Sequence, residues 1–181
     1  MKIAISVGHS ILRSGACTSA DGTALGGGNE YKFCSEFAPF LKRALEKNGH
    51  EVTIIEVPKK SVSSVSEERK YKVSKYNSQK FNLNIELHLN AANNTKAKGT
   101  EALYISDEGK KYAVAICTKL GELWTNRGAK KRTNLYFLNT TKASAVLLEL
   151  FFCTNKAEWK KAQINKRKMA RLITEAIASV K

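Results

Sequence analysis

The chain has 181 residues, of which 43% are hydrophobic and 26% are charged, and its formal net charge at pH 7 is +15. This length suits one domain with its own core, and the composition excludes a disordered or fibrous protein. The charge predicts attraction to polyanions, either nucleic acid or the anionic polymers of a bacterial wall, unless it serves solubility alone.

The first predicted strand covers residues 3–7 (IAISV) and is followed directly by Gly8 and His9. This apolar run is too short for an export signal, and no run in the chain reaches transmembrane length. We therefore expect a chain that is made in the cytoplasm and is not inserted in a membrane. Residues 11–29 are rich in glycine and show little periodicity, which predicts a long functional loop.

The next segments alternate between helical and strand patterns. From Glu30 the spacing of apolar residues predicts a helix that Pro39 kinks and Gly49 ends. Residues 50–57 predict a second strand. Residues 61–78 are polar and basic, which predicts a solvated helix.

Residues 83–90 (LNIELHLN) alternate strictly between apolar and polar side chains, as expected of a strand. Its polar face carries Asn84, Glu86, His88 and Asn90. Residues 99–105 predict a fourth strand, and apolar residues between 113 and 124 mark another helix. No strand or helix is predicted for residues 125–144.

Residues 145–150 (AVLLEL) form an apolar run typical of a strand covered on both faces, and Glu149 is its single charge. Asn155 and Glu158 have the spacing of a capping box before the C-terminal helical region. The alternation of strands and helices predicts a single α/β domain. The four cysteines form no CxxC pair, so we interpret them as reduced and mostly buried thiols.

Three polar side chains lie at or near the ends of predicted strands: His9, His88 and Glu149. Ligands of open α/β sheets bind beyond the carboxyl ends of the strands, so these side chains could converge. Two imidazoles and a carboxylate suggest a catalytic zinc site with three protein ligands. His50, between a helix end and a strand, is interpreted as structural.

Spacing alone leaves the third zinc ligand open among four carboxylates: Glu30, Glu86, Glu101 and Glu149. A buried carboxylate is costly without a proton, a cation or a function, which draws attention to Glu149. Glu86 shares a face with His88 and could be a hydrogen-bond partner of that candidate ligand, but we favour solvent or a salt bridge. Asn90 shares that face and is a candidate for contact with substrate.

Four segments together resemble the zinc-dependent N-acetylmuramoyl-L-alanine amidases, most closely the catalytic domains of endolysins from clostridial bacteriophages. They are ISVGHS, GGGNEYKF, IELHLNA and AVLLELFFCTN, and they span nearly the whole chain. The resemblance implies a twisted, mostly parallel sheet flanked by helices. It also implies that residues 1–181 are one catalytic domain, without a wall-binding domain.

The resemblance further implies the chemistry: hydrolysis of the amide between N-acetylmuramic acid and L-alanine in peptidoglycan. His9, Glu30 and His88 would bind Zn²⁺, and Glu149 would be the catalytic acid and base. Without an export signal, a phage lysin would stay in the cytoplasm until it is released to the wall.

Three alternatives remain at this point. A host mother-cell or autolytic amidase would share the chemistry, and another zinc peptidase, such as a carboxypeptidase, would share the fold. A basic nucleic-acid-binding module would explain the charge. We do not expect nucleic acid as the partner, because the basic residues are dispersed and no binding motif occurs.

Overall fold

The computed structural model describes residues 1–180. These residues form one mixed sheet of six strands with helices on both faces. In spatial order it reads β2-β1-β3-β6-β4-β5. Strands β1, β2, β3 and β6 are parallel, whereas β4 is antiparallel to β6, and β5 is parallel to β4. The predicted α/β fold with a mostly parallel sheet is confirmed. The strands are β1 (Lys2–Val7), β2 (Glu51–Ile55), β3 (Leu83–Asn90), β4 (Thr100–Tyr104), β5 (Asn126–Lys131) and β6 (Ser144–Phe152).

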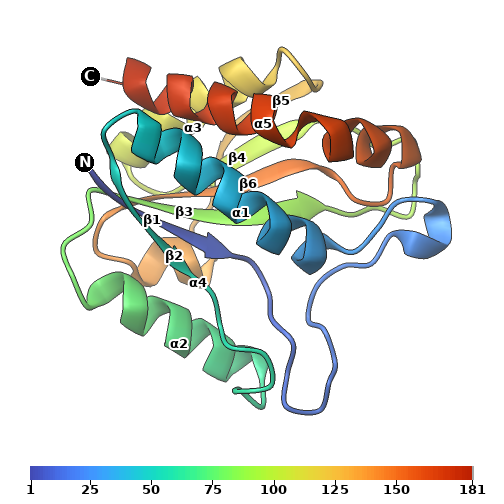
Figure 1. Ribbon diagram of the computed structural model, residues 1–181, viewed down its shortest axis with the longest axis horizontal. Coiled ribbons are helices and arrows are strands. Elements are labelled where there is room, and N and C mark those ends of the chain that lie inside the picture. Colours follow the sequence, from blue (N-terminus) through green and yellow to red (C-terminus); the bar gives the residue numbers. More distant parts are fainter. Residues whose placement is uncertain (181) are drawn as a thin grey trace.

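Helices cover both faces of this sheet, as Figure 1 shows. Helices α1, α3 and α5 pack on one face and form the larger apolar core with it. Helices α2 and α4 cover the other face over a smaller core. The helices are α1 (Glu30–Lys47), α2 (Val65–Asn77), α3 (Asp107–Leu120), α4 (Tyr136–Thr140) and α5 (Lys156–Ser179), with a 3-10 turn at Thr23–Leu25.

Most predicted elements are present with shifted ends. Helix α1 continues through Pro39 to Lys47, and Gly49 follows with a φ of 78°. Asn155 caps α5 by accepting hydrogen bonds from the next turn, but Glu158 does not complete a capping box. Its carboxylate accepts hydrogen bonds from the backbone of Gly99 and Phe152 and so joins α5 to the sheet.

Two elements were not predicted, β5 and α4. Strand β5 (NRGAKK) lies at the sheet edge and is largely exposed, so it carries no apolar pattern. Helix α4 has five residues, too few for a helical period to be recognised.

The prediction that residues 61–78 form a solvated helix is wrong in one respect. Helix α2 buries Glu68, Lys72 and Tyr76 against the sheet. Glu68 and Lys72 lie four positions apart, on one side of the helix. The inward face therefore consists mostly of polar residues that pair with each other, and a search for apolar periodicity does not detect it.

The four cysteines are free; Cys17 is exposed and the other three are buried. None of the helices in residues 1–180 is both long enough and apolar enough to cross a membrane.

Candidate metal centre and active site

The candidate site lies where the winding of the sheet changes direction. Strand β1 pairs with β2 on one side and with β3 on the other, so the crossovers that leave β1 and β2 run to opposite sides. Such a switch point leaves a crevice beyond the carboxyl ends of the strands, where ligands of α/β sheets bind. His9 follows β1 at this edge, and His88 lies near the end of β3.

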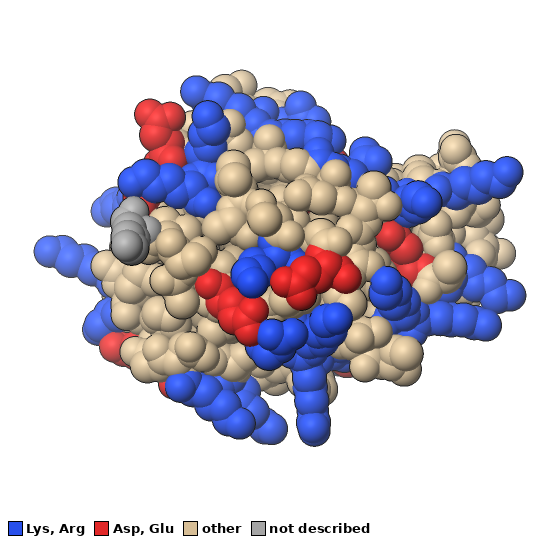
Figure 2. Space-filling view, turned by 90° about the horizontal axis from the view of Figure 1, so that it is seen from above, with Lys and Arg blue, Asp and Glu red and all other residues tan. Residues whose placement is uncertain are grey.

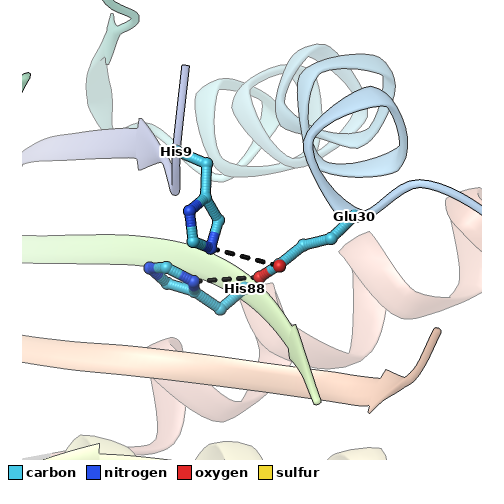
Figure 3. Close-up of side chains that lie close together, drawn as sticks. All are labelled: His9, Glu30 and His88. Carbon is cyan, nitrogen blue, oxygen red and sulfur yellow. Dashed lines mark hydrogen bonds and ion pairs between the residues drawn. The ribbon is translucent and has the colours of Figure 1, made fainter. Parts of the chain in front are cut away.

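Three of the residues singled out in the sequence meet at this edge, as Figure 3 shows. Nε2 of His9 lies 3.1 Å from Oε2 of Glu30, and Nδ1 of His88 lies 3.0 Å from Oε1 of the same carboxylate. The two imidazole rings are nearly perpendicular, with centroids 4.8 Å apart. One potential ligand atom from each side chain falls within 4.8 Å of the others.

The backbone holds the Glu30 carboxylate in place from two sides. Oε1 accepts a hydrogen bond from the amide of Leu89 at 2.9 Å, and Oε2 accepts one from the amide of Ala20 at 3.1 Å. Ala20 belongs to the glycine-rich loop, and the amide of Glu30 donates back to the Ala20 carbonyl. The loop therefore fixes both the start of α1 and the direction of its first side chain.

Several glycines of this loop are required by close packing. A Cβ atom at Gly28 would collide with the indole of Trp159 on α5, and one at Gly27 would collide with the carbonyl of Cys153. The loop thus lies directly on the end of β6 and the start of α5. Close packing therefore explains the glycines at positions 22, 27 and 28.

The turn after β1 places His9 beside His88. His9 has a φ of 68°, in the left-handed region that non-glycine residues seldom adopt, and such conformations are often found at functional sites. Gly8, just before it, donates a hydrogen bond to the carbonyl of Leu87 on β3. The imidazole of His88 then lies directly over Gly8, where a side chain would otherwise stand.

We expect Gly8→Ala to disrupt the site without unfolding the protein. The added methyl would lie about 2.5 Å from Nε2 of His88, so the ring must move away from Glu30. Metal content by elemental analysis should fall to a small fraction of that of the wild type. The matched control is Gly15→Ala, since no atom lies within 4 Å of a Cβ there, although its positive φ of 89° adds some strain. Full metal content in Gly8→Ala would show that this contact is not needed.

Glu149 lies next to His88 in the sheet, because the two residues are register partners on β3 and β6. Its carboxyl is mostly buried, and Oε2 has no hydrogen-bond partner within residues 1–180. Burial raises the pKa of Glu149 to about 7; the nearby His88 opposes this shift, while the carboxylate of Glu30 adds to it. Near neutral pH such a group can both accept and donate a proton.

The other candidate carboxylates lie outside the three-residue cluster. Glu101 is paired with Arg127 and Lys130 of β5, at 2.9 and 2.5 Å. Glu86 is buried, so the expectation that it faces solvent is wrong, whereas the expected salt bridge exists, with Lys72 at 2.8 Å. Glu86 also contacts Nε2 of His88 at 3.2 Å, on the side of the ring opposite Glu30.

The two remaining polar candidates have different surroundings. Asn90 lies at the end of β3, beyond a register irregularity, and its Nδ2 is buried without a partner among the described residues. Its contact with substrate stays a prediction. His50 lies just before β2, and its Nδ1 is 3.4 Å from the N-terminal amine. It is separate from the cluster, in agreement with its structural interpretation.

The donor set of the cluster fits Zn²⁺. Two imidazoles and a carboxylate occur together in catalytic zinc sites, with metal–ligand bonds of about 2.0–2.2 Å. Ligands of a tetrahedral ion with such bonds lie about 3.3 Å apart, close to the N–O separations of 3.0 and 3.1 Å measured here. Two of the three ligand separations therefore already suit the ion, and the potential ligand atoms of the two imidazoles lie within 4.8 Å of each other.

The short contacts between the imidazoles and Glu30 also shift the pKa values of these groups when no metal is bound. Burial alone would raise the pKa of Glu30, but hydrogen bonds from His88 and His9 outweigh it and keep this pKa well below its usual range. Burial alone would lower the pKa of His88, but hydrogen bonds to Glu30 and Glu86 raise it to about 10. Without metal, His88 is thus an imidazolium at neutral pH, and a metal ion must displace its proton.

NMR titration of the protein after metal removal with a chelator should show different pKa values for His88 and His50. We expect His88 to remain protonated at pH 8 and His50 to be neutral there, since burial lowers the pKa of His50. A raised histidine pKa stabilises the fold fully below pH 6.5, and this contribution is lost as the pH rises toward 10. An imidazole signal of His88 that titrates near pH 6.5 would contradict the prediction.

A cavity of about 260 Å³ opens beside the two imidazoles, on the side of α2 and α4. Its walls are largely apolar, with Val65 and Tyr136 partly exposed at its edge. Arg69 also lines it, and its side chain is exposed. The cavity offers space for part of a substrate next to the candidate metal centre.

Comparisons with known proteins agree with this arrangement. The family model described as N-acetylmuramoyl-L-alanine amidase matches residues 3–179. The chain is 48% identical to the catalytic domain of the CD27L endolysin targeting Clostridia difficile, over 98% of this chain and 97% of that one, with a TM-score of 0.93. No match was found among the curated proteins.

More distant solved structures share the fold. Cwp6 from Clostridium difficile is 24% identical, with a TM-score of 0.83 over 99% of this chain and 29% of that one. The CwlD amidase from Clostridioides difficile, solved in complex with the GerS lipoprotein, is 21% identical, with a TM-score of 0.85 over 99% and 97%.

Proposed function

The chain belongs to the N-acetylmuramoyl-L-alanine amidase family and is an enzyme of that type, and from this premise we propose that it is a zinc-dependent endolysin. In this proposal His9, Glu30 and His88 bind Zn²⁺, and Glu149 is the catalytic acid and base. The substrate bond is the amide between N-acetylmuramic acid and L-alanine. The observation that carries the proposal is the convergence of two histidines and Glu30 at the strand ends, with Glu149 beside them.

The bound ion would polarise the amide carbonyl and acidify the attacking water. The chain's own contribution begins with orientation, since the amides of Leu89 and Ala20 hold the Glu30 carboxylate toward both imidazoles. The left-handed turn at His9 and the space above Gly8 keep the two rings together. Little reorganisation would then be needed when substrate binds.

Glu149 would move the protons. Its carboxylate would take a proton from the attacking water and then deliver it to the departing alanine nitrogen, because an amine leaves easily only when it is protonated. Oε2 is buried and has no partner among residues 1–180, which favours the protonated form, so the proton can be held between the two transfers. A pKa of about 7 suits both halves of this exchange.

Digestion of purified peptidoglycan tests the proposed reaction. We expect a new free amino terminus on L-alanine, intact glycan chains, and loss of activity after chelation that added Zn²⁺ restores. Mass spectrometry of the products identifies the bond that is cut. Released terminal D-amino acids would instead indicate a carboxypeptidase, and full activity in chelator would contradict zinc dependence.

The endolysin role rests on the similarity to the CD27L catalytic domain. A host mother-cell or autolytic amidase of the same chemistry is the alternative, because solved proteins from Clostridium difficile and Clostridioides difficile share the fold. Location in the cytoplasm until release to the wall is part of the endolysin proposal. Lysis of intact clostridial cells by protein added from outside would support it, and lysis restricted to isolated spore walls would contradict it.

The basic surface predicts that lysis depends on salt. The chain carries a net charge of +15. Figure 2 views the molecule from above relative to Figure 1, and Lys and Arg side chains are spread around the face seen there. We expect lysis of intact walls, which carry anionic polymers, to slow by roughly tenfold between about 0.05 and 0.5 M NaCl as the charges are screened. The control is a small soluble muramyl peptide, whose hydrolysis should change little. Equal salt dependence of both substrates would rule out attraction to the wall.

A further inference from the structure

The ring nitrogens of His9 and His88 that face away from Glu30 both have polar partners. Nε2 of His88 lies 3.2 Å from Oε1 of Glu86, and Nδ1 of His9 lies 3.4 Å from Oγ1 of Thr18. These partners contact the side of each ring that a metal ion would leave free. They are therefore placed to set the direction of each ring.

Both partners lead to the same buried lysine on α2. Lys72 lies 2.8 Å from Oε2 of Glu86 and 3.2 Å from Oε1 of Glu68. Oε2 of Glu68 then accepts a hydrogen bond from Thr18 at 2.9 Å. One continuous chain of contacts thus runs from His88 through Glu86, Lys72, Glu68 and Thr18 to His9.

The burial of this chain sets it apart from surface ion pairs. The side chains of Glu68, Lys72 and Glu86 are between 4% and 7% exposed. Two hydroxyl groups add hydrogen bonds at 2.9 Å: Ser6 donates to the same oxygen of Glu86 that contacts Lys72, and Ser10 donates to the oxygen of Glu68 that also accepts from Thr18. A buried ion pair gains little stability over apolar packing, so a role other than stability is worth considering for this one.

We infer that Lys72 is a positioning residue, which holds Glu86 and Glu68 so that they fix the two histidine rings for metal binding. This inference rests on the proposed zinc site. In this role Lys72 acts through the two carboxylates, although all three side chains also line the cavity beside the imidazoles. Partners of this kind typically change metal affinity or activity by about 10–100-fold when they are removed.

Zinc affinity of the metal-free protein, measured by competition with a chromophoric chelator, tests the inference. We expect Lys72→Met to weaken binding by about 10–100-fold and to lower kcat more than it raises KM. Lys72→Arg, which keeps the charge and the donors, should recover most of the affinity. The matched control is Lys70→Met, since Lys70 is an exposed lysine on the same helix.

Lys72→Met leaves two buried carboxylates without a cation and could fail to fold for that reason. A second variant keeps the test possible in that case. In Lys72→Met/Glu86→Gln one of those carboxylates is also neutralised, while Glu68 keeps its two hydroxyl donors. Zinc affinity should again fall by about 10–100-fold. Thermal unfolding of the metal-free variants measures their folding stability separately from their zinc affinity.

The outcomes separate this inference from the proposed function. Wild-type zinc affinity in either folded Lys72 variant would show that Lys72 is only structural, even if its melting temperature falls, and would overturn the inference alone. Failure of the wild-type protein to bind Zn²⁺ would overturn both. If the wild type binds zinc and hydrolyses the amide, and the Lys72 variants have unchanged zinc affinity, the proposed function still holds.

Discussion

Glu149→Gln should lower kcat on peptidoglycan by about 10²–10⁴-fold while the protein keeps its zinc, since general acid–base catalysis contributes about that much. Glutamine has nearly the shape of glutamate but cannot take a proton from water or return one to the leaving nitrogen. The carboxyl is mostly buried with its pKa near 7, so a neutral amide should not destabilise the fold. The loss of activity is measured by the release of amino termini, and the zinc content of the same sample is measured by elemental analysis.

The matched control is Glu101→Gln. Glu101 is the register partner of Glu149 on β4, but its carboxylate is neutralised by two basic side chains of β5. We expect this variant to stay within a few-fold of wild-type activity. Near wild-type activity of Glu149→Gln would remove Glu149 from the proposed mechanism, and loss of its zinc would make it part of the metal site instead.

Glu30→Gln should lose most of its bound zinc, and the activity with it. The carboxylate contacts both imidazoles and supplies the negative charge of the site, which a neutral amide cannot provide. Loss of a hydrogen-bond partner of a metal ligand already costs about 10–100-fold in metal affinity, so removal of a direct ligand should exceed that range. Dialysis against a chelator of known zinc affinity, followed by elemental analysis, measures the change.

Two variants make this test specific to Glu30. Glu101→Gln should keep full zinc content, since its carboxylate is engaged with β5. His50→Ala should also keep it, because His50 lies next to the N-terminal amine and outside the cluster. Full zinc content in Glu30→Gln would show that another group is the third ligand.

Part of the site could be read from the sequence because strands impose a strict geometry. An alternating pattern places His88 and Glu86 on one face of β3, and a histidine after a short apolar strand lies at its carboxyl end. From these rules alone, His9, His88 and Glu149 are expected at the same edge of the sheet. The rules could not choose among the four carboxylates, and the family resemblance pointed to Glu30.

The same rules missed the residues that hold the histidines. Lys72 and Glu68 lie on a helix without an apolar face, so the sequence pattern of α2 is typical of a helix in solvent. Their pairing with Glu86 crosses from helix to sheet between residues far apart in the sequence. A buried salt bridge of this kind leaves no periodic signal, because each partner is a common surface residue.

The sequence by itself determined the α/β class, the order of most strands and helices, and two histidines and a glutamate at strand ends. Local patterns were sufficient there, since hydrophobic periodicity depends only on near neighbours. The tertiary structure decided which carboxylate meets the histidines, because Glu30 reaches them only through the loop that packs on β6 and α5. It also decided that α2 contacts the site through Lys72, because contacts between distant segments depend on how the elements pack together.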